Sequence, residues 1–292
     1  MKQGRAVWIV AVAIFLTGAG RAPIYLGVLE SPIEASQPFR VRVAFRFEGG
    51  RWAAMPNDAD DEDALAKLPA KFPSQVAWAI ARQGKKVGTV SSVRPRKYSF
   101  YSDAGLEDLT ADSKPPRVLD DAVAFATWMG TPKYRPLVVV SEPNYEDPDQ
   151  WRAFDAPAAM RKQAAAAFRL AITPDDDDCH GGGPGSYPDS AIQVFGKPYR
   201  SKYGDVLIAM RPDPRRNRCD GPVGDEWQSV WFHLKGANIR RIGSALTLLD
   251  IGDYSDDGTA KILFQYDGYN RDGYVLFDPR DDSKTEFSWS YH

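Results

Sequence analysis

Three tyrosines, Tyr266, Tyr269 and Tyr274, follow one another closely near the C-terminal end of the chain. Most residues between them are Asp, Gly, Asn or Arg, which is the composition of a polar loop. Tyrosine offers a large amphipathic surface with few rotatable bonds, and this suits recognition of a carbohydrate or another protein. We therefore predict a binding surface at these tyrosines. The alternative is that they alternate along strands and are buried in the core.

A second candidate segment covers residues 249–264, in which Asp253, Ser255 and Asp257 alternate before Gly258. Alternating residues of a tight loop aim their side chains at one point, and glycine permits the sharp turn. The segment resembles the FG-GAP (VCBS-type) repeat of integrin-like propellers and of many exported bacterial proteins. The resemblance implies a calcium loop, with side-chain ligands from Asp253, Ser255 and Asp257 and the backbone carbonyl of Thr259.

The chain departs from the family pattern at Lys261, because the repeat usually has an acidic residue at this position. A lysine there places a positive charge close to the expected ion and opposes calcium binding. Two interpretations therefore remain: calcium is a possible cofactor, or the loop keeps its turn without the metal.

The sequence contains none of the linear motifs of common hydrolases or nucleotide-binding enzymes, such as Gly-x-Ser-x-Gly, His-Glu-x-x-His or a phosphate-binding glycine loop. Acidic residues are numerous, but a carboxylate pair becomes catalytic only when burial or a partner changes its pKa. The sequence therefore favours a non-catalytic binding or structural module. A secreted hydrolase, for example a carboxylate-pair glycosidase, is the alternative.

The N-terminal segment has the order of a secretory signal. Lys2 and Arg5 precede an apolar stretch at residues 6–16, and small residues follow at 17–20. The stretch is too short for a membrane-spanning helix, and no later segment is suitable. We predict cleavage near residue 22, no integral membrane segment afterwards, and a periplasmic or secreted protein.

The two cysteines of the chain, Cys179 and Cys219, both follow the predicted signal peptide. In an exported protein, two cysteines are more often bonded than free. Four aspartates precede Cys179 and several arginines surround Cys219, so a bond would bring opposite charges together. We predict a Cys179–Cys219 disulfide.

The formal net charge is −2, and removal of the signal would make it more negative. A chain with this balance has no excess of basic residues for a nucleic-acid surface, so nucleic acid is not an expected partner. An extracellular protein or a carbohydrate remains the expected partner class.

Strand patterns dominate the N-terminal half of the chain. We expect strands at residues 39–47 with one solvent-facing side, a return at 51–55, a hairpin over 76–90, and further strands at 97–101 and 136–140. A short helix is expected over 122–128 after Asp120 and Asp121. Residues 23–37 show little periodicity and are expected to be an irregular lead-in.

One clear helix is expected over residues 158–172, which are rich in alanine and follow Pro157. Strands are then expected at 205–210, 228–234, 244–249, 261–266, 273–277 and 285–289. Residues 260–277 weakly repeat the pattern of residues 204–234, and the offset between the two segments is within the length of a propeller blade.

These patterns predict a mainly β (α+β) protein with two antiparallel β units joined by one Ala-rich helix. The C-terminal unit resembles propeller blades. The expected parts are the signal peptide at 1–22, a β domain at 23–145, the helix with an acidic Gly-rich loop at 146–190, and an FG-GAP-like module at 191–292.

Overall fold

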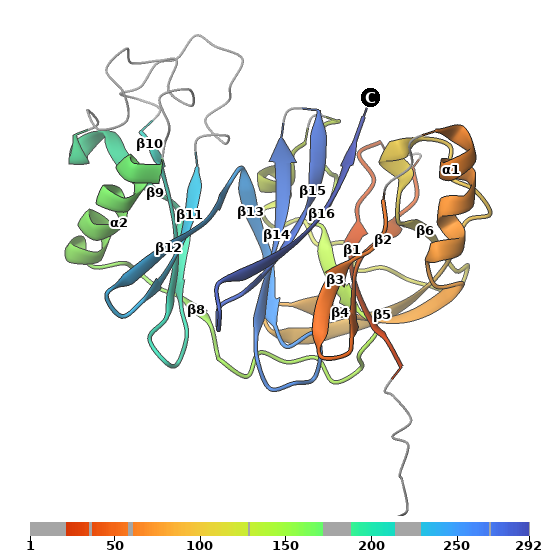
Figure 1. Cartoon of the computed structure of the whole chain (residues 1–292), viewed down its shortest axis with the longest axis horizontal. Helices are drawn as coiled ribbons and strands as arrows, with labels where there is room; N and C mark the ends of the chain where they lie inside the picture. The colour runs from red at the N-terminus through yellow and green to blue at the C-terminus, as the bar shows by residue number, and fades with distance from the viewer. Residues whose placement is uncertain are drawn as a thin grey trace, which may run out of the picture.

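The computed structural model describes residues 22–34, 37–57, 61–127, 129–171, 188–213, 229–268 and 270–291. Over these residues the protein is mainly β, and its sheets are antiparallel (Figure 1). The prediction of a mainly β fold is confirmed. Cys179, Cys219 and the predicted signal peptide through residue 21 lie outside the described residues, so the disulfide and the signal remain predictions.

The first sheet closes into a six-stranded barrel in the order β1-β7-β4-β5-β6-β2, and pairing of β2 with β1 completes the ring. A seventh strand, β3, pairs with β2. The strands are β1 (Ile24–Glu30), β2 (Arg40–Glu48), β3 (Arg51–Ala54), β4 (Gln75–Arg82), β5 (Lys85–Val93), β6 (Leu106–Leu109) and β7 (Leu137–Val140). The strands expected at 39–47, 51–55 and 136–140 and the hairpin over 76–90 are confirmed.

The hairpin between β4 and β5 turns at Gln83 and Gly84, which both have positive φ angles, 52° and 71°. Two successive residues in this region match the twist of a two-residue hairpin. Gly84 is also closely covered, because a Cβ at this position would lie 2.6 Å from the Cβ of Asp147. The turn is therefore held against the segment that leaves the barrel.

Three expectations for the N-terminal half are wrong. Residues 24–30 form β1, because a strand paired on both sides and largely buried needs no alternation. Residues 97–101 form bends that lead into a 3₁₀ turn at Tyr101–Asp103, where the Asp103 carboxylate accepts hydrogen bonds from two backbone amides. The helix expected at 122–128 is a 3₁₀ turn at Ala122–Phe125, and Asp121 provides no side-chain cap.

A short helix, α1 (Glu62–Lys67), and a 3₁₀ turn at Leu68–Lys71 connect β3 to β4. The helix begins at Asp61, whose carboxylate accepts the backbone N–H of Ala64 at 2.7 Å. Leu65 and Leu68 are buried, which places this connection against the barrel core.

The C-terminal half contains two antiparallel sheets. The five-stranded sheet has the order β12-β11-β10-β9-β8, and the four-stranded sheet has the order β13-β14-β15-β16. Their strands are β8 (Arg152–Ala153), β9 (Ile192–Arg200), β10 (Val206–Pro212), β11 (Val230–Lys235), β12 (Asn238–Ser244), β13 (Leu246–Gly252), β14 (Lys261–Gly268), β15 (Arg271–Asp278) and β16 (Ser283–Ser290). All six strands expected after the helix are present, whereas β9 and β12 were missed.

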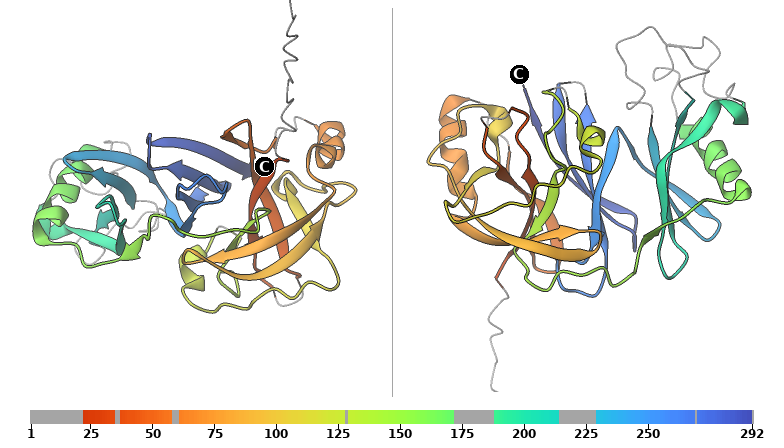
Figure 2. Two further views of the ribbon diagram at one scale, coloured as in Figure 1. Left: turned by 90° about the horizontal axis from the view of Figure 1, so that it is seen from below. Right: turned by 180° about the vertical axis from the view of Figure 1, so that it is seen from behind.

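The sheets, the helix and the barrel form successive layers (Figures 1 and 2). Helix α2 (Ala158–Ala171) packs on β9 to β12, so the helix expected at 158–172 is confirmed in its position. Instead of joining two halves, it covers the face of the five-stranded sheet that points away from the barrel (Figure 1). Its small Ala164 and Ala165 are buried there and permit close packing.

The four-stranded sheet is buried on both faces. One face packs against the five-stranded sheet, where the rings of Trp231 and Phe264 meet at 5.2 Å. The other face shares a continuous apolar core with the barrel through Leu263, Leu276 and Phe287. The barrel and this sheet therefore form one packed body, while the division into a signal peptide and three further parts remains a prediction.

Strand β2 differs from its expected half-buried pattern. Residues 41–45 are all buried, including Arg42, which is 4% exposed. The expected solvent-facing side of this strand is confirmed at Arg46, which is exposed, and is wrong at Arg42 and Ala44. The C-terminal β16 covers this part of the strand, and Trp289 lies beneath the Arg42 guanidinium at 3.8 Å.

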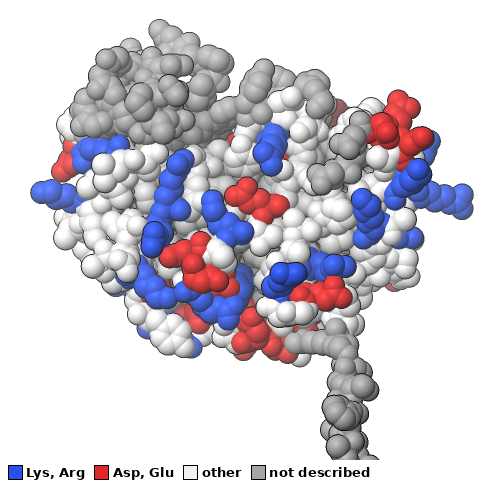
Figure 3. All heavy atoms as spheres, viewed as in Figure 1, with Lys and Arg blue, Asp and Glu red and all other residues white. Residues whose placement is uncertain are grey.

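No helix among the described residues has the length and apolar composition needed to cross a membrane. On the face shown in Figure 3, Lys and Arg side chains are interspersed with Asp and Glu side chains.

Candidate functional site

The loop between β13 and β14 contains the predicted calcium ligands, and Asp253 organises it. One oxygen of the Asp253 carboxylate accepts the backbone N–H groups of Ser255 at 3.0 Å and Asp257 at 3.2 Å. The other accepts the N–H of Gly258 at 2.6 Å. Gly258 has a φ of 78°, which explains the glycine at the turn. The tight-turn geometry expected from the sequence is present.

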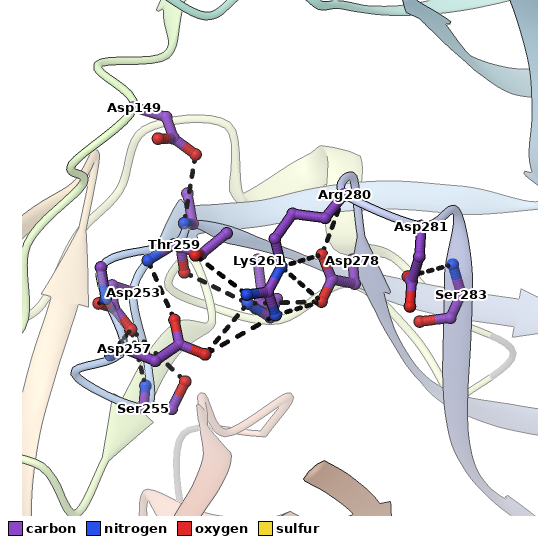
Figure 4. Close-up of polar contacts among 12 residues, drawn as sticks. Asp149, Asp253, Ser255, Asp257, Thr259, Lys261, Asp278, Arg280, Asp281 and Ser283 are labelled. Carbon is purple, nitrogen blue, oxygen red and sulfur yellow. Dashed lines mark hydrogen bonds and ion pairs between the residues drawn. The ribbon is translucent and has the colours of Figure 1, made fainter. Parts of the chain in front are cut away.

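A buried cation lies beside this loop (Figure 4). The Lys261 ammonium is 3.4 Å from the Thr259 carbonyl oxygen, 3.7 Å from an Asp257 carboxylate oxygen and 3.5 Å from Asp278. Lys261 is only 2% exposed. Arg280 adds a second cation, which hydrogen-bonds the Asp278 carboxylate at 2.8 Å and the Thr259 hydroxyl at 3.2 Å.

The predicted calcium ligands therefore divide into two groups. Ser255 and the loop amides surround Asp253, whereas Asp257 and the carbonyl of Thr259 face the Lys261 ammonium (Figure 4). Calcium requires six to eight oxygens at 2.3–2.6 Å and tolerates a nearby ammonium poorly. The residues present do not fit a calcium ion at the Asp257 and Thr259 end of the loop.

The loop also holds the segment that connects the barrel to the sheets. The backbone N–H of Asp253 donates to the carbonyl of Glu146 at 2.8 Å, and the N–H of Ala260 donates to the Asp149 carboxylate at 3.3 Å. Beside the loop, the rings of Tyr145 and Tyr254 stack at 5.6 Å. The loop is therefore part of a junction between the linker at 142–151 and the four-stranded sheet.

A cavity of about 310 Å³ opens between the barrel and the four-stranded sheet. Its polar lining comes from both sides: Glu30, Arg42 and Asp103 from the barrel, and Asp272 and Tyr274 from β15. Its apolar lining includes Ile33, Pro38, Leu106, Phe125, Met129 and Trp289. The volume is at the lower end of the range for small-molecule sites.

Arg42 and Glu30 form the central ion pair of this cavity. The guanidinium binds the carboxylate with two nitrogens, at 2.5 and 3.2 Å, and donates to the carbonyls of Ser102 and Ala104 at 2.8 and 2.7 Å. Burial alone would lower the pKa of Arg42, but the charge and hydrogen bonds of Glu30 raise it above its ordinary value. Glu30 also accepts the Tyr274 hydroxyl at 2.7 Å. Both members of the pair therefore have hydrogen-bonding partners within the fold.

Asp272 is a second acid of the cavity, with a different environment. It is 2% exposed, it accepts the Tyr291 hydroxyl, and it lies directly opposite Asp267 in the β14–β15 ladder. Burial raises the pKa of Asp272 to about 7; a hydrogen bond with Asp267 and the charge of Glu30 act in the same direction, against the hydrogen bond from Tyr291. At neutral pH this carboxyl is therefore protonated in part of the molecules.

Tyr266 and Tyr274 do not form one exposed platform. Tyr274 is buried and lines the cavity, and it also reaches a separate depression that Tyr266 lines next to Phe287 and Arg271. Tyr269 lies outside the described residues. Of the two predicted binding tyrosines that the structure describes, Tyr274 lies in the main cavity, together with Trp289, which also occurs near the end of the sequence.

Sequence reasoning missed Glu30, Arg42 and Asp272. Glu30 ends a strand that was not recognised, and Asp272 resembles the other acids of its polar segment. The arginines of residues 39–47 were recognised as the polar positions of an alternating strand, but this alternation placed all of their side chains in solvent. Only knowledge of which sheet covers β2 distinguishes Arg42 from its neighbours.

Comparisons with protein-family models, with curated proteins and with solved structures find no match for this chain. The FG-GAP resemblance therefore remains a prediction from the sequence.

Proposed function

We propose that this protein is an exported, non-catalytic binding module whose ligand enters the cavity between the barrel and the four-stranded sheet. The supporting observation is that this cavity combines apolar walls with buried polar groups from two separate parts of the fold. Such a combination is typical of small-molecule sites. Export rests on the predicted signal peptide and is tested by determining the N-terminus of the native protein, which would begin near residue 23.

The polar groups of the cavity favour a ligand rich in hydrogen-bond donors. Among its acids, Glu30 is already bound by Arg42 and Tyr274, whereas Asp103 and Asp272 are acceptors when ionised. The two cations of its lining are already paired with carboxylates, since Arg42 binds Glu30 and Arg40 lies 3.4 Å from Asp108. A small carbohydrate meets these requirements, because it offers hydroxyl donors and an apolar ring face to side chains such as Trp289.

Blocking the cavity tests this proposal. Ile33 is a partly exposed residue of its lining, so Ile33→Trp would fill the entrance without disturbing the buried network. Calorimetric titration with soluble mono- and disaccharides is expected to show binding that falls at least about tenfold in this variant. Val87→Trp, at an exposed position of β5 away from the cavity, is the matched control and is expected to bind normally. Equal binding by both variants would contradict the assignment of the cavity.

A carboxylate-pair hydrolase is a second candidate, favoured by the different environments of Glu30 and Asp272. Glu30 is paired with Arg42, whereas burial raises the pKa of Asp272 to about 7. A carboxyl with a raised pKa near a second carboxylate is the arrangement of a general acid with a base or nucleophile. If nitrophenyl glycosides are hydrolysed, Glu30→Gln and Asp272→Asn are each expected to lower kcat by about 100-fold or more. The activity is also expected to fall as the pH rises above about 7, where Asp272 loses its proton. Absence of turnover in the wild-type protein would leave binding as the function of the cavity.

The relation to propeller blades is also part of this proposal. Strands β9 to β12 and β13 to β16 form two successive four-stranded meanders stacked face to face. This supports a distant relation to FG-GAP blades, in which a barrel packs beside the second blade.

A further inference from the structure

The loop of residues 253–261 contains its own cation. The Lys261 side chain is almost fully buried, and its ammonium lies among three oxygens, which belong to Asp257, Thr259 and Asp278. A buried ammonium is costly unless negative charges surround it. Here the carboxylates of Asp257 and Asp278 provide that charge.

The surrounding oxygens are of the kind that bind divalent ions. Asp257 contributes a carboxylate from the alternating Asp-Ser-Asp positions, and Thr259 contributes a backbone carbonyl, which are both typical calcium ligands. They lie 3.7 and 3.4 Å from the ammonium nitrogen. An ion at ordinary calcium distances would need these oxygens to move inward and the ammonium to leave.

Arg280 strengthens the same arrangement from the turn after β15. Its guanidinium binds Asp278 at 2.8 Å, lies 3.7 Å from Asp257 and hydrogen-bonds Thr259. Burial alone would raise the pKa of Asp278, but the hydrogen bonds of Arg280 and the charge of Lys261 lower it below its usual value. At this end of the loop, two cations therefore balance the carboxylates of Asp257 and Asp278, so these two acids offer no net negative charge to a divalent ion.

We propose that the Lys261 ammonium, assisted by Arg280, replaces a divalent metal ion in this loop. The loop thereby holds the linker at Glu146 and Asp149 without a metal. The advantage is a junction between the barrel and the four-stranded sheet that does not depend on the calcium concentration outside the cell.

Calcium titration of the wild-type protein and of Lys261→Asp tests the proposal. The substitution removes the cation and adds a carboxylate two residues after the Thr259 carbonyl. We expect no calorimetric signal for the wild-type protein and an unchanged melting temperature in EDTA. For Lys261→Asp we expect a lower melting temperature in EDTA, recovery of stability with calcium, and a calorimetric signal of calcium binding that the wild-type protein does not give.

Two further variants make the test decisive. Lys261→Met removes the charge without adding a ligand, so it is expected to melt at a lower temperature than the wild-type protein whether or not calcium is present. Lys261→Asp/Arg280→Gln removes the second cation and is expected to bind calcium more tightly than the single variant. Stabilisation of the wild-type protein by calcium, or its destabilisation by EDTA, would overturn the proposal. A folded Lys261→Asp that ignores calcium would overturn it equally.

Discussion

Replacing Arg42 with methionine is expected to lower the free energy of unfolding by about 3 kcal/mol, measured by urea denaturation of the full chain. Methionine retains an apolar stem that packs on Trp289, but it cannot bind Glu30 or the carbonyls of Ser102 and Ala104. The loss arises because a partly buried carboxylate and two backbone oxygens remain without their donor.

Arg46→Met is the matched control for this prediction. Arg46 is on the same strand and pairs with Glu48 at 3.1 Å, but both side chains are about half exposed. Exposed pairs contribute about 0–1 kcal/mol. Adding Glu30→Gln to Arg42→Met is expected to recover part of the loss, because the unpaired charge is removed. Equal stability of the Arg42 and Arg46 single variants would show that Arg42 does not hold the barrel against the four-stranded sheet.

The contrast between Arg42 and Arg46 shows how far local pattern predicts this fold. Alternation located β2 correctly, because the period of the strand depends only on neighbouring residues. It assigned both arginines to solvent, although one is buried. The difference arises from the packing of β16, which is more than 200 residues away in sequence. No local pattern contains this information.

Of two largely apolar strands of the barrel, the sequence predicted one and missed the other, again because of contacts with residues distant in sequence. The run at 137–140 was recognised, whereas the apolar residues of β1 were interrupted by Gly27 and were missed. A Cβ at residue 27 would lie 2.3 Å from the carbonyl oxygen of Arg42, so glycine is required by the close approach of β2. The glycine that weakened the strand signal is thus a consequence of the pairing itself.

The candidate sites also differ in whether neighbouring residues or the assembled fold determine them. The loop at 253–261 was located from the sequence because its geometry is encoded locally by Asp253 and Gly258. The role of Lys261 was only partly accessible, since Asp278 and Arg280 come from a later turn. The cavity was not predictable, because its acids belong to β1, β15 and the 3₁₀ turn at Tyr101–Asp103 and meet only in the assembled fold.

A further large effect is expected from pH. Glu107 is fully buried inside the barrel, where Ser92 donates to one of its carboxylate oxygens and itself accepts the indole N–H of Trp78 at 2.7 Å. Among the described residues, no group donates to the other oxygen. Burial raises the pKa of Glu107 to about 7, against the hydrogen bond from Ser92 and the charge of Arg94. Glu107 in turn contributes to the raised pKa of Tyr98, after burial.

Two other buried acids act in the same direction. Burial raises the pKa of Asp250 to about 6, although the Tyr145 hydroxyl donates to it at 2.6 Å. The pKa of Asp272 is raised to about 7. Above their ordinary pKa values, the unfolded chain has released these protons while the folded protein still binds them. Stability is therefore greatest below about pH 4.5 with respect to these groups and is lost as the pH rises to about 7.

Glu107→Gln isolates one of these contributions. The neutral amide retains an acceptor for the Ser92 hydroxyl and needs no proton, so the variant is expected to lose less stability than the wild-type protein between pH 5 and pH 8. The difference between the ordinary pKa of a glutamate and the raised pKa of Glu107 corresponds to roughly 3 kcal/mol of stability, which is an upper limit for the effect. We expect the difference in the free energy of unfolding between the variant and the wild-type protein to change by about 1–3 kcal/mol in favour of the variant between pH 5 and pH 8.

Denaturation curves at both pH values measure this difference. Glu48→Gln, at an exposed end of β2, is the control and is expected to leave the pH dependence unchanged. Because Asp250 and Asp272 remain, the Glu107 variant should keep part of the decline with pH. If it declined as steeply as the wild-type protein, Glu107 would be ionised throughout this range and the barrel interior would have to solvate its charge. The three raised pKa values thus lower the stability of the fold as the pH rises from acidic to neutral, and they connect this stability to the protonation of Asp272, an acid that lines the cavity.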